Sequence, residues 1–263
     1  MNTIAVMSQK GGVGKTITVA NLGPALAAQG LRVLMVDMDP QADLSASWGI
    51  EENEDFLRIE DLLAGQSDHT DAALVDMSPV GLADSLYLLP SSSDLRRQTA
   101  RLLTGPSDHF AEVLTTIATP IDVALIDTPA GETIFGAQAI VAADQTIVTL
   151  LPGYHELRAL TRVLDRIDRQ SEAIGTDLSL LGVLIANADP RWRTTRDYAD
   201  HLNTEQIPLF DTIIPRRQAV TGHARYGEPT ILLEPGNAVA QAYARLAEEV
   251  TARLKAPTAA SAR

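Results

Sequence analysis

Hydrophobic residues along the chain form two alternating patterns: short unbroken runs, and longer stretches with helical periodicity. The short runs are rich in β-branched residues and have the length of buried strands. They cover residues 4–7, 32–36, 86–89, 123–126, 146–150, 180–186 and 207–214. The helical stretches cover residues 16–29, 157–174, 194–203 and 238–254. Strands that alternate with helices predict an α/β fold: a three-layer, doubly wound, mostly parallel sheet with helices on both faces.

This pattern fits one domain, because neither an internal repeat nor a long linker interrupts it. Residues 51–80 are rich in acidic side chains and have an amphipathic pattern only over 56–64, so we expect mostly loop there. The last residues, 256–263, are small side chains with one proline and one arginine. We therefore expect a single domain over residues 1–255 and a disordered tail over residues 256–263.

Composition is that of a soluble globular protein, because 45% of the 263 residues are hydrophobic. No apolar run reaches the roughly 18–20 residues that a membrane span needs. Residues 1–3 lead directly into the first apolar run, without the basic leader of a signal peptide. These features predict a cytoplasmic protein with no membrane partner. The absence of cysteine excludes disulfides, iron–sulfur clusters and thiol nucleophiles.

The segment between the first predicted strand and the first predicted helix reads Lys-Gly-Gly-Val-Gly-Lys-Thr, residues 10–16. A strand, a glycine-rich turn and a helix in this order are typical of a phosphate-binding loop. Glycine lets successive N–H groups point at phosphate oxygens, and the helix adds its N-terminal dipole. Lys15 would neutralise the β- and γ-phosphates, and the Thr16 hydroxyl would bind Mg2+. The predicted ATP-binding residues are Gly11, Gly12, Val13, Gly14, Lys15, Thr16 and Ile17.

Three aspartates follow predicted strands, at the edge of an open α/β sheet where ligands bind. Asp37 and Asp39 follow the strand at 32–36, and Asp127 follows the strand at 123–126. Asp39 would orient or deprotonate the attacking water, and Asp37 would lie near Mg2+ and Thr16. Asp127 has the Walker B position, in which a carboxylate holds Mg2+ through water. Each acid alone could be a helix cap, but the three together with the phosphate loop predict an ATPase.

Two details give the phosphate loop a family resemblance. The general pattern starts with glycine, but Gln9 stands there and Lys10 adds a second lysine. This variant resembles the deviant Walker A motif of the ParA/MinD family of P-loop NTPases. Residues 36–42 (VDMDPQA) and 121–129 (IDVALIDTP) resemble that family's VDxDPQ and YDxxxIDxPP segments. The resemblance extends over about residues 3–254, nearly the whole chain.

The resemblance to ParA proteins implies a DNA-segregation ATPase with weak basal activity. In this family ATP closes a homodimer, and Lys10 would act in catalysis by reaching the partner subunit's ATP. The dimer would bind non-specific DNA on the nucleoid, and a ParB-type centromere-binding protein would stimulate hydrolysis and release. Adenine contacts are expected at the strand ends around Asn187 and Pro215. Ile17 replaces a second threonine that the family usually carries.

Other members of the superfamily fit less well. The nitrogenase iron protein needs cysteines, and MinD ends in a basic amphipathic helix that lies on a membrane. The last predicted helix here carries Glu248 and Glu249, so we expect an ordinary packing helix. The chain starts at its first strand, as in short ParA proteins without an N-terminal helix-turn-helix domain. A ParA-like positioner of protein cargo and a MinD-like membrane-cycling regulator remain alternatives.

The net charge of −13 has the wrong sign for a protein that coats DNA, so DNA contact requires a local basic patch. Arginines near the C-terminal end provide a candidate: Arg191, Arg193, Arg196, Arg216, Arg217 and Arg225. Such a patch would bind phosphates without reading sequence. The alternative is a solvated helix face on which Asp197 and Asp200 balance the arginines. Ala219 and Glu228 stand where relatives commonly carry basic residues, which weakens the expectation of DNA binding.

Overall fold

A seven-stranded sheet is the centre of the computed structural model, which describes residues 1–52, 56–65, 70–79, 84–175, 178–216 and 229–255. The strand order is β3-β4-β2-β5-β1-β6-β7. The strands are β1 (Asn2–Met7), β2 (Val33–Asp37), β3 (Val75–Asp76), β4 (Leu86–Leu89), β5 (Val123–Asp127), β6 (Gln145–Leu150) and β7 (Ser179–Ile185). Only the short β3 pairs antiparallel to its neighbour among these strands. The mostly parallel sheet predicted from the sequence is therefore confirmed.

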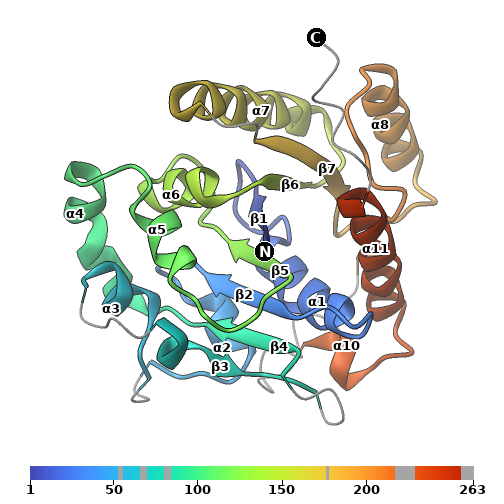
Figure 1. Ribbon diagram of the computed structural model, residues 1–263. Helices are drawn as coiled ribbons and strands as arrows, with labels where there is room; N and C mark the ends of the chain where they lie inside the picture. The colour runs from blue at the N-terminus through green and yellow to red at the C-terminus, as the bar shows by residue number, and fades with distance from the viewer. Residues whose placement is uncertain (53–55, 66–69, 80–83, 176–177, 217–228, 256–263) are drawn as a thin grey trace.

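Helices cover both faces of this sheet and complete the predicted three layers (Figure 1). One face packs against α1 (Lys15–Ala27), α2 (Asp43–Ser47), α10 (Thr230–Leu233) and α11 (Ala238–Lys255). The other packs against α3 (Ile59–Leu63), α4 (Thr99–Thr104), α5 (His109–Thr115), α6 (Ile134–Ala142), α7 (Tyr154–Ile174) and α8 (Arg193–Thr204). Two short 3-10 helices are η1 (Thr70–Ala73) and η2 (Ser93–Gln98).

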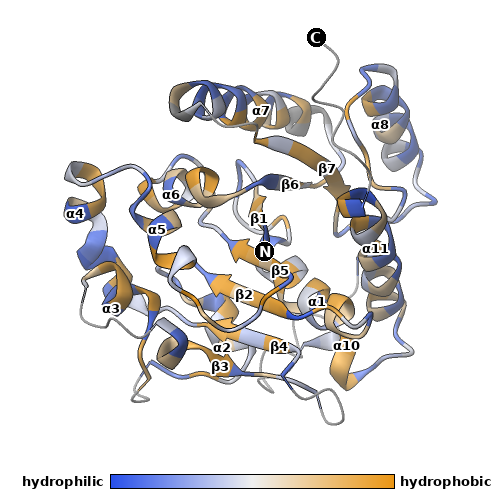
Figure 2. Ribbon diagram, in the orientation of Figure 1, coloured by the Kyte–Doolittle hydropathy of each residue, from blue (hydrophilic) through white to orange (hydrophobic). Residues whose placement is uncertain are grey.

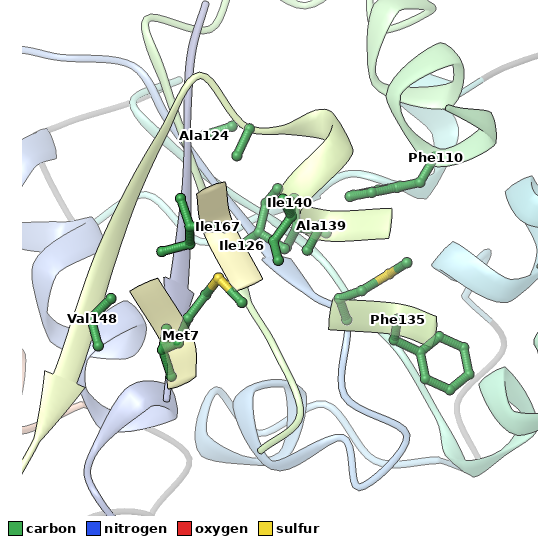
Figure 3. Close-up of a cluster of buried hydrophobic side chains, with 14 of the residues drawn as sticks. Met7, Phe110, Ala124, Ile126, Phe135, Ala139, Ile140, Val148 and Ile167 are labelled. Atoms are coloured by element: carbon green, nitrogen blue, oxygen red, sulfur yellow. The ribbon is translucent and has the colours of Figure 1, made fainter. Parts of the chain in front are cut away.

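The strands are buried on both faces, which explains their unbroken apolar runs. Successive side chains point to opposite sides of a strand. Thus Ile4 and Val6 join the core on the α1 side, whereas Ala5 and Met7 join the core on the α7 side. Figure 2 shows the strands as mostly hydrophobic and the outer faces of α7 and α8 as largely hydrophilic. Figure 3 shows part of the core on the α7 side, built by side chains of the sheet, α5, α6 and α7.

The predicted helices at 16–29, 157–174, 194–203 and 238–254 form as α1, α7, α8 and α11, with ends shifted by up to three residues. The α11 helix is the ordinary packing helix that we expected: Tyr243, Leu246 and Val250 are buried against the α1 side of the core. Within the described ranges, no helix is both long and apolar enough to cross a membrane. The predicted disordered tail, residues 256–263, lies outside the described residues.

The predicted strand at 207–214 is wrong. This segment runs beside β7, but in the described chain it forms only the isolated bridge Val183–Leu209, and Pro215, just after the segment, bridges Ala188. The cause lies in α11, where the Glu249 carboxylate accepts hydrogen bonds from the backbone N–H groups of Asp211 and Thr212, at 2.8 and 2.9 Å. These two donors are therefore not available for a continuous ladder with β7.

The acidic segment at 51–80 contains more structure than its pattern predicted. The amphipathic piece at 56–64 forms the short helix α3, and η1 and β3 follow it. The α2 helix, just before this segment, was also missed. The unpredicted elements α2, η1 and β3 have at most five residues each, too short to show a hydrophobic period.

Candidate functional site

The predicted phosphate loop connects β1 to α1 and has the backbone that its glycines allow. Gly12 and Gly14 have φ angles of 73° and 93°, a region that residues with a Cβ seldom adopt. Gly14 is the N-cap of α1 and has no side chain with which to bond the first N–H groups of the helix. A Cβ atom added at Gly11 or Gly12 would meet nothing within 4 Å. The space beside these two glycines is therefore open, as a phosphate-binding loop requires.

The first turn of α1 carries the side chains predicted to bind phosphate and metal. Lys15 is only 7% exposed, and its charge opposes the rise that burial causes in the pKa of Asp43 and of Asp127. Thr16 lies beside Asp127 and also opposes the rise in the pKa of that carboxyl. Ile17, by contrast, packs against the core on the α1 side. The Ile17 side chain thus contributes to packing, and only its backbone remains as a candidate for contact with phosphate.

Asp127 is the most unusual polar residue of the site. It ends β5 next to Asp37 of β2, and the two are paired in the parallel register. Asp127 is completely buried, and neither of its carboxylate oxygens accepts a hydrogen bond from a described residue. Burial, followed by the charge of Asp37, raises the pKa of Asp127 well above its ordinary value. The Thr16 hydroxyl is near enough to oppose this rise, although its geometry is not that of a hydrogen bond.

The orphaned carboxylate fits a magnesium site of the nucleotide-dependent kind. Among the described residues, no three His, Cys, Asp or Glu side chains form a complete metal cage. Mg2+ seldom uses such a cage, because it usually binds one or two protein oxygens together with substrate phosphates and water. A buried carboxylate without a partner is costly and calls for a cation. Asp127 and Thr16, beside an open phosphate loop, are the residues that could hold one.

Asp37 is equally buried but fully engaged. Its Oδ2 accepts hydrogen bonds from the Ser45 N–H and hydroxyl, at 2.8 and 2.7 Å, and its Oδ1 accepts one from the Asp39 N–H at 3.2 Å. Burial raises the pKa of Asp37 to about 6, while the bonds from Ser45 oppose the rise. Asp37 therefore ties α2 and the Asp39 loop to the end of β2. It lies beside Asp127, near the predicted metal position.

Asp39 occupies the loop between β2 and α2 and is half-buried. Its Oδ1 accepts a hydrogen bond from the Gln41 N–H at 2.9 Å, and its carbonyl accepts one from the Ser91 hydroxyl at 3.0 Å. The Ser91 N–H donates to the Ser45 hydroxyl at 3.0 Å, and buried Arg58 donates to the Ser91 carbonyl at 3.0 Å. Sequence reasoning missed Ser45, Ser91 and Arg58. No motif or spacing marks them, because the Ser45–Ser91 contact joins residues 46 positions apart.

Lys10 lies at the exposed surface of the same loop. The Ser8 hydroxyl donates to its carbonyl at 2.7 Å and shapes the turn. Lys10 also borders a small hollow whose other walls include Val148 of β6 and Leu160 of α7. An exposed lysine at the mouth of the site is placed where it could reach another molecule, and its action in trans remains a prediction.

The two residues predicted to contact adenine lie near each other. Asn187 follows β7, is exposed and has a φ angle of 52°. The next residue, Ala188, forms a bridge to Pro215. This strand end is also close to the phosphate loop, since a Cβ atom added at Gly14 would lie 3.5 Å from that of Ala186. The chain fold therefore brings the predicted adenine and phosphate contacts to one edge of the sheet.

The described arginines of the predicted basic patch are all exposed, but they are not equally available. Arg191 forms an ion pair with Asp189 at 2.8 Å and lowers the pKa of that carboxyl to about 2. Arg193 pairs with Asp197 at 3.4 Å. Part of their charge is thus offset, as in the alternative of a solvated helix face. The remaining positions discussed for DNA binding, Arg217, Ala219, Arg225 and Glu228, lie outside the described residues.

Comparisons with known proteins agree with this geometry. A family model described as an AAA domain matches residues 1–180. The chain is 32% identical to the chromosome partitioning protein ParA of Caulobacter vibrioides (strain NA1000 / CB15N), over 96% of this chain and 95% of that protein. It is 31% identical to the chromosome-partitioning ATPase Soj of Treponema pallidum, over 95% and 97%.

A solved structure gives the same picture. Cobyrinic acid a,c-diamide synthase from Mycobacterium smegmatis, with bound ADP and magnesium, superposes with a TM-score of 0.82 at 29% identity. The alignment covers 97% of this chain and 96% of the synthase. The likeness therefore includes the whole sheet and both helical layers.

Proposed function

The chain belongs to the ParA-type partition ATPases, and from this premise we propose that it segregates DNA as an ATP-bound homodimer. The dimer binds DNA without sequence preference, and a ParB-type centromere-binding protein releases it by stimulating ATP hydrolysis. The protein would accordingly work in the cytoplasm, on the nucleoid. The observation that carries the proposal is the orphaned Asp127 carboxylate beside an open phosphate loop.

Each part of the site has a role in this cycle. The N–H groups of residues 11–16 and the Lys15 ammonium bind the phosphates of ATP. Thr16 and Asp127 hold Mg2+, which neutralises charge on the phosphates when bound. Asp39 orients the attacking water from the loop that Ser91 holds. Lys10 reaches the ATP of the partner subunit, which makes hydrolysis depend on the dimer.

The test is DNA binding by the purified protein at low salt, with ATP, ADP or no nucleotide. We expect binding with ATP and Mg2+ alone, and its loss in Lys15→Ala. Arg196→Gln should weaken DNA binding without changing ATP hydrolysis, since Arg196 is exposed on α8 and is not one of the predicted nucleotide or metal residues. Arg32→Gln, an exposed arginine on another face, is the matched control. A dimer that ignores DNA at low salt with every nucleotide would refute the proposal.

A protein cargo is the second candidate, and the ion pairs of Arg191 and Arg193 favour it. Paired guanidinium groups add less to phosphate binding than unpaired ones do. The slope of DNA affinity against salt separates the candidates, because each phosphate contact adds about 0.9 to that slope. A membrane-cycling role would require binding to liposomes in the presence of ATP. The apolar face of α11 is packed in the core and offers no surface for it.

A further inference from the structure

The loop that follows Asp127, residues 128–133, is attached to the phosphate-loop side of the site at two points. The Thr128 hydroxyl donates to the carbonyl of Val6 in β1 at 2.8 Å. The Gly131 N–H donates to the carbonyl of Ser8 at 3.2 Å. Ser8 in turn donates to the Lys10 carbonyl. A shift of this loop would therefore be felt both at Asp127 and at the base of the phosphate loop.

A third attachment comes from the opposite direction, from α7. Arg166 donates from Nη1 to the carbonyl of Gly131 at 2.8 Å and from Nη2 to the carbonyl of Thr133 at 3.1 Å. Gly131 has a φ angle of 75°, so it forms the tight corner of the loop. Its N–H is bound on one side and its carbonyl on the other. The corner is thus clamped between Ser8 and Arg166.

Using Arg166 to pack α7 against this loop costs free energy, because a charged group is partly removed from water. Its guanidinium is partly buried, and burial lowers its pKa, while the charge of Glu132 opposes that shift. No described carboxylate forms an ion pair with it. Its guanidinium donates to two carbonyls of one loop, and a planar group with two donors binds such a pair with defined geometry. The guanidinium fits beside α6 because residue 136 is glycine. A Cβ atom at this position would lie only 3.0 Å from Nη2 and would crowd it.

We propose that Arg166 is a positioning residue for ATP hydrolysis. Through Gly131 and Thr133 it holds the loop after Asp127 against the phosphate loop, so that Asp127 and the reacting phosphate keep their relative placement. The side chain does not touch the nucleotide. It acts through the loop backbone, and its effect therefore falls on turnover more than on nucleotide binding. The proposal depends on ATP hydrolysis and not on DNA or any cargo.

The test compares Arg166→Gln with Arg162→Gln, an exposed arginine one turn earlier on α7. Hydrolysis is measured without DNA or partner protein, as steady-state kcat and KM for ATP, together with the Kd for ADP. For Arg166→Gln we expect a loss of about 10- to 100-fold in kcat, with KM and Kd changed by less than about 2-fold. Arg162→Gln should behave as the unmodified protein does. The kcat of Arg166→Lys should lie between those of Arg166→Gln and Arg162→Gln, because one ammonium group cannot bind both carbonyls.

Gly136→Ala provides an independent second variant. It leaves Arg166 in place, but the added Cβ atom would lie 3.0 Å from Nη2 of Arg166 and 3.3 Å from the Thr133 hydroxyl, so we expect a smaller loss of kcat, of about 2- to 5-fold. The proposal is overturned if Arg166→Gln keeps the kcat of the control. It is overturned equally if kcat, ADP affinity and melting temperature fall together in both Arg166→Gln and Arg166→Lys, because that result describes a structural role alone.

Discussion

Asp37 and Asp127 end neighbouring strands at the same level of the sheet, and both are completely buried, but the protein treats them differently. Asp37 accepts hydrogen bonds from Ser45 and Asp39, while no described residue donates one to Asp127. Burial raises the pKa of both carboxyls, to about 6 for Asp37. The two residues thus share an environment and differ in their partners.

This difference separates a structural acid from a ligand acid. A buried carboxylate that accepts several hydrogen bonds stabilises the elements that donate them. A buried carboxylate without donors opposes folding until a cation binds it. Position at the end of a strand predicted the same neighbourhood for both acids, near Mg2+. The hydrogen bonds show that Asp37 supports the Asp39 loop, while Asp127 has no such partner among the described residues and stays the predicted Mg2+ ligand.

The largest expected effect is the loss of ATP hydrolysis in the Asp127→Asn variant. The amide has the same shape but no charge with which to hold Mg2+, so we expect ATP hydrolysis to fall by about 100-fold. Steady-state phosphate release over a range of Mg2+ concentrations measures this loss. Circular dichroism of the variant would show that the fold is kept. Hydrolysis within about 2-fold of the unmodified rate would remove Asp127 from the metal site.

The next effect is on stability, where Ser45→Ala is compared with Ser47→Ala on the same helix. Ser45 donates to the buried Asp37 carboxylate and accepts from Ser91, whereas the Ser47 hydroxyl donates to the carbonyl of Leu44 in its own helix. We expect Ser45→Ala to lower the free energy of unfolding by about 2 kcal/mol, and Ser47→Ala by less than about 0.5 kcal/mol. Urea unfolding measures both. Equal losses would show that Asp37 is not an organising residue.

A smaller effect on stability, a gain instead of a loss, is expected for Asp127→Asn when nucleotide is absent and Mg2+ is chelated. Replacing an unpaired buried charge by an amide should raise the free energy of unfolding by about 1 kcal/mol, whereas Asp37→Asn should lower it. With Mg2+ and ADP added, Asp127→Asn should be less stable than the original protein, because only the carboxylate is stabilised by bound metal. Thermal melts in both conditions give the comparison. A variant less stable than the original protein in both would contradict it.

The parts of the molecule that sequence could predict are those fixed by local patterns. Leu86–Leu89 forms β4 with the predicted bounds, because a strand buried on both faces is a continuous apolar run. The phosphate loop is equally local, since its glycines, Lys15 and Thr16 act within a few residues of one another. A strand, a turn and a helix in sequence were sufficient to place it.

The parts that could not be predicted depend on contacts between distant residues. The segment at 207–214 has the composition of a strand, but Glu249, 37 and 38 positions away, binds two of its N–H groups. Arg166 reaches Gly131 across 35 positions. Asp37 and Asp127 look alike in sequence, and only the donors around them separate their roles. Spacing along the chain does not encode such partners.

The smallest effect tests the other end of β5, where Asp122 precedes the strand that Asp127 ends. Asp122 is half-buried and bound by exposed Arg32 at 2.8 Å, and these hydrogen bonds lower its pKa from 3.8 to about 2. A lowered pKa in the folded state means that the stabilisation is present above about pH 4 and is lost as the pH falls toward 2.

We therefore expect Asp122→Asn to lower the melting temperature at pH 7 by about 1 °C or less, because water and salt screen an exposed pair. The difference in melting temperature between Asp122→Asn and the original protein should become smaller below pH 4 and in about 0.5 M salt. The rate of ATP hydrolysis should not change. A loss of hydrolysis in Asp122→Asn would mean that the two ends of β5 are coupled. In that case the orphaned state of Asp127 could no longer be treated as a local property of the nucleotide edge.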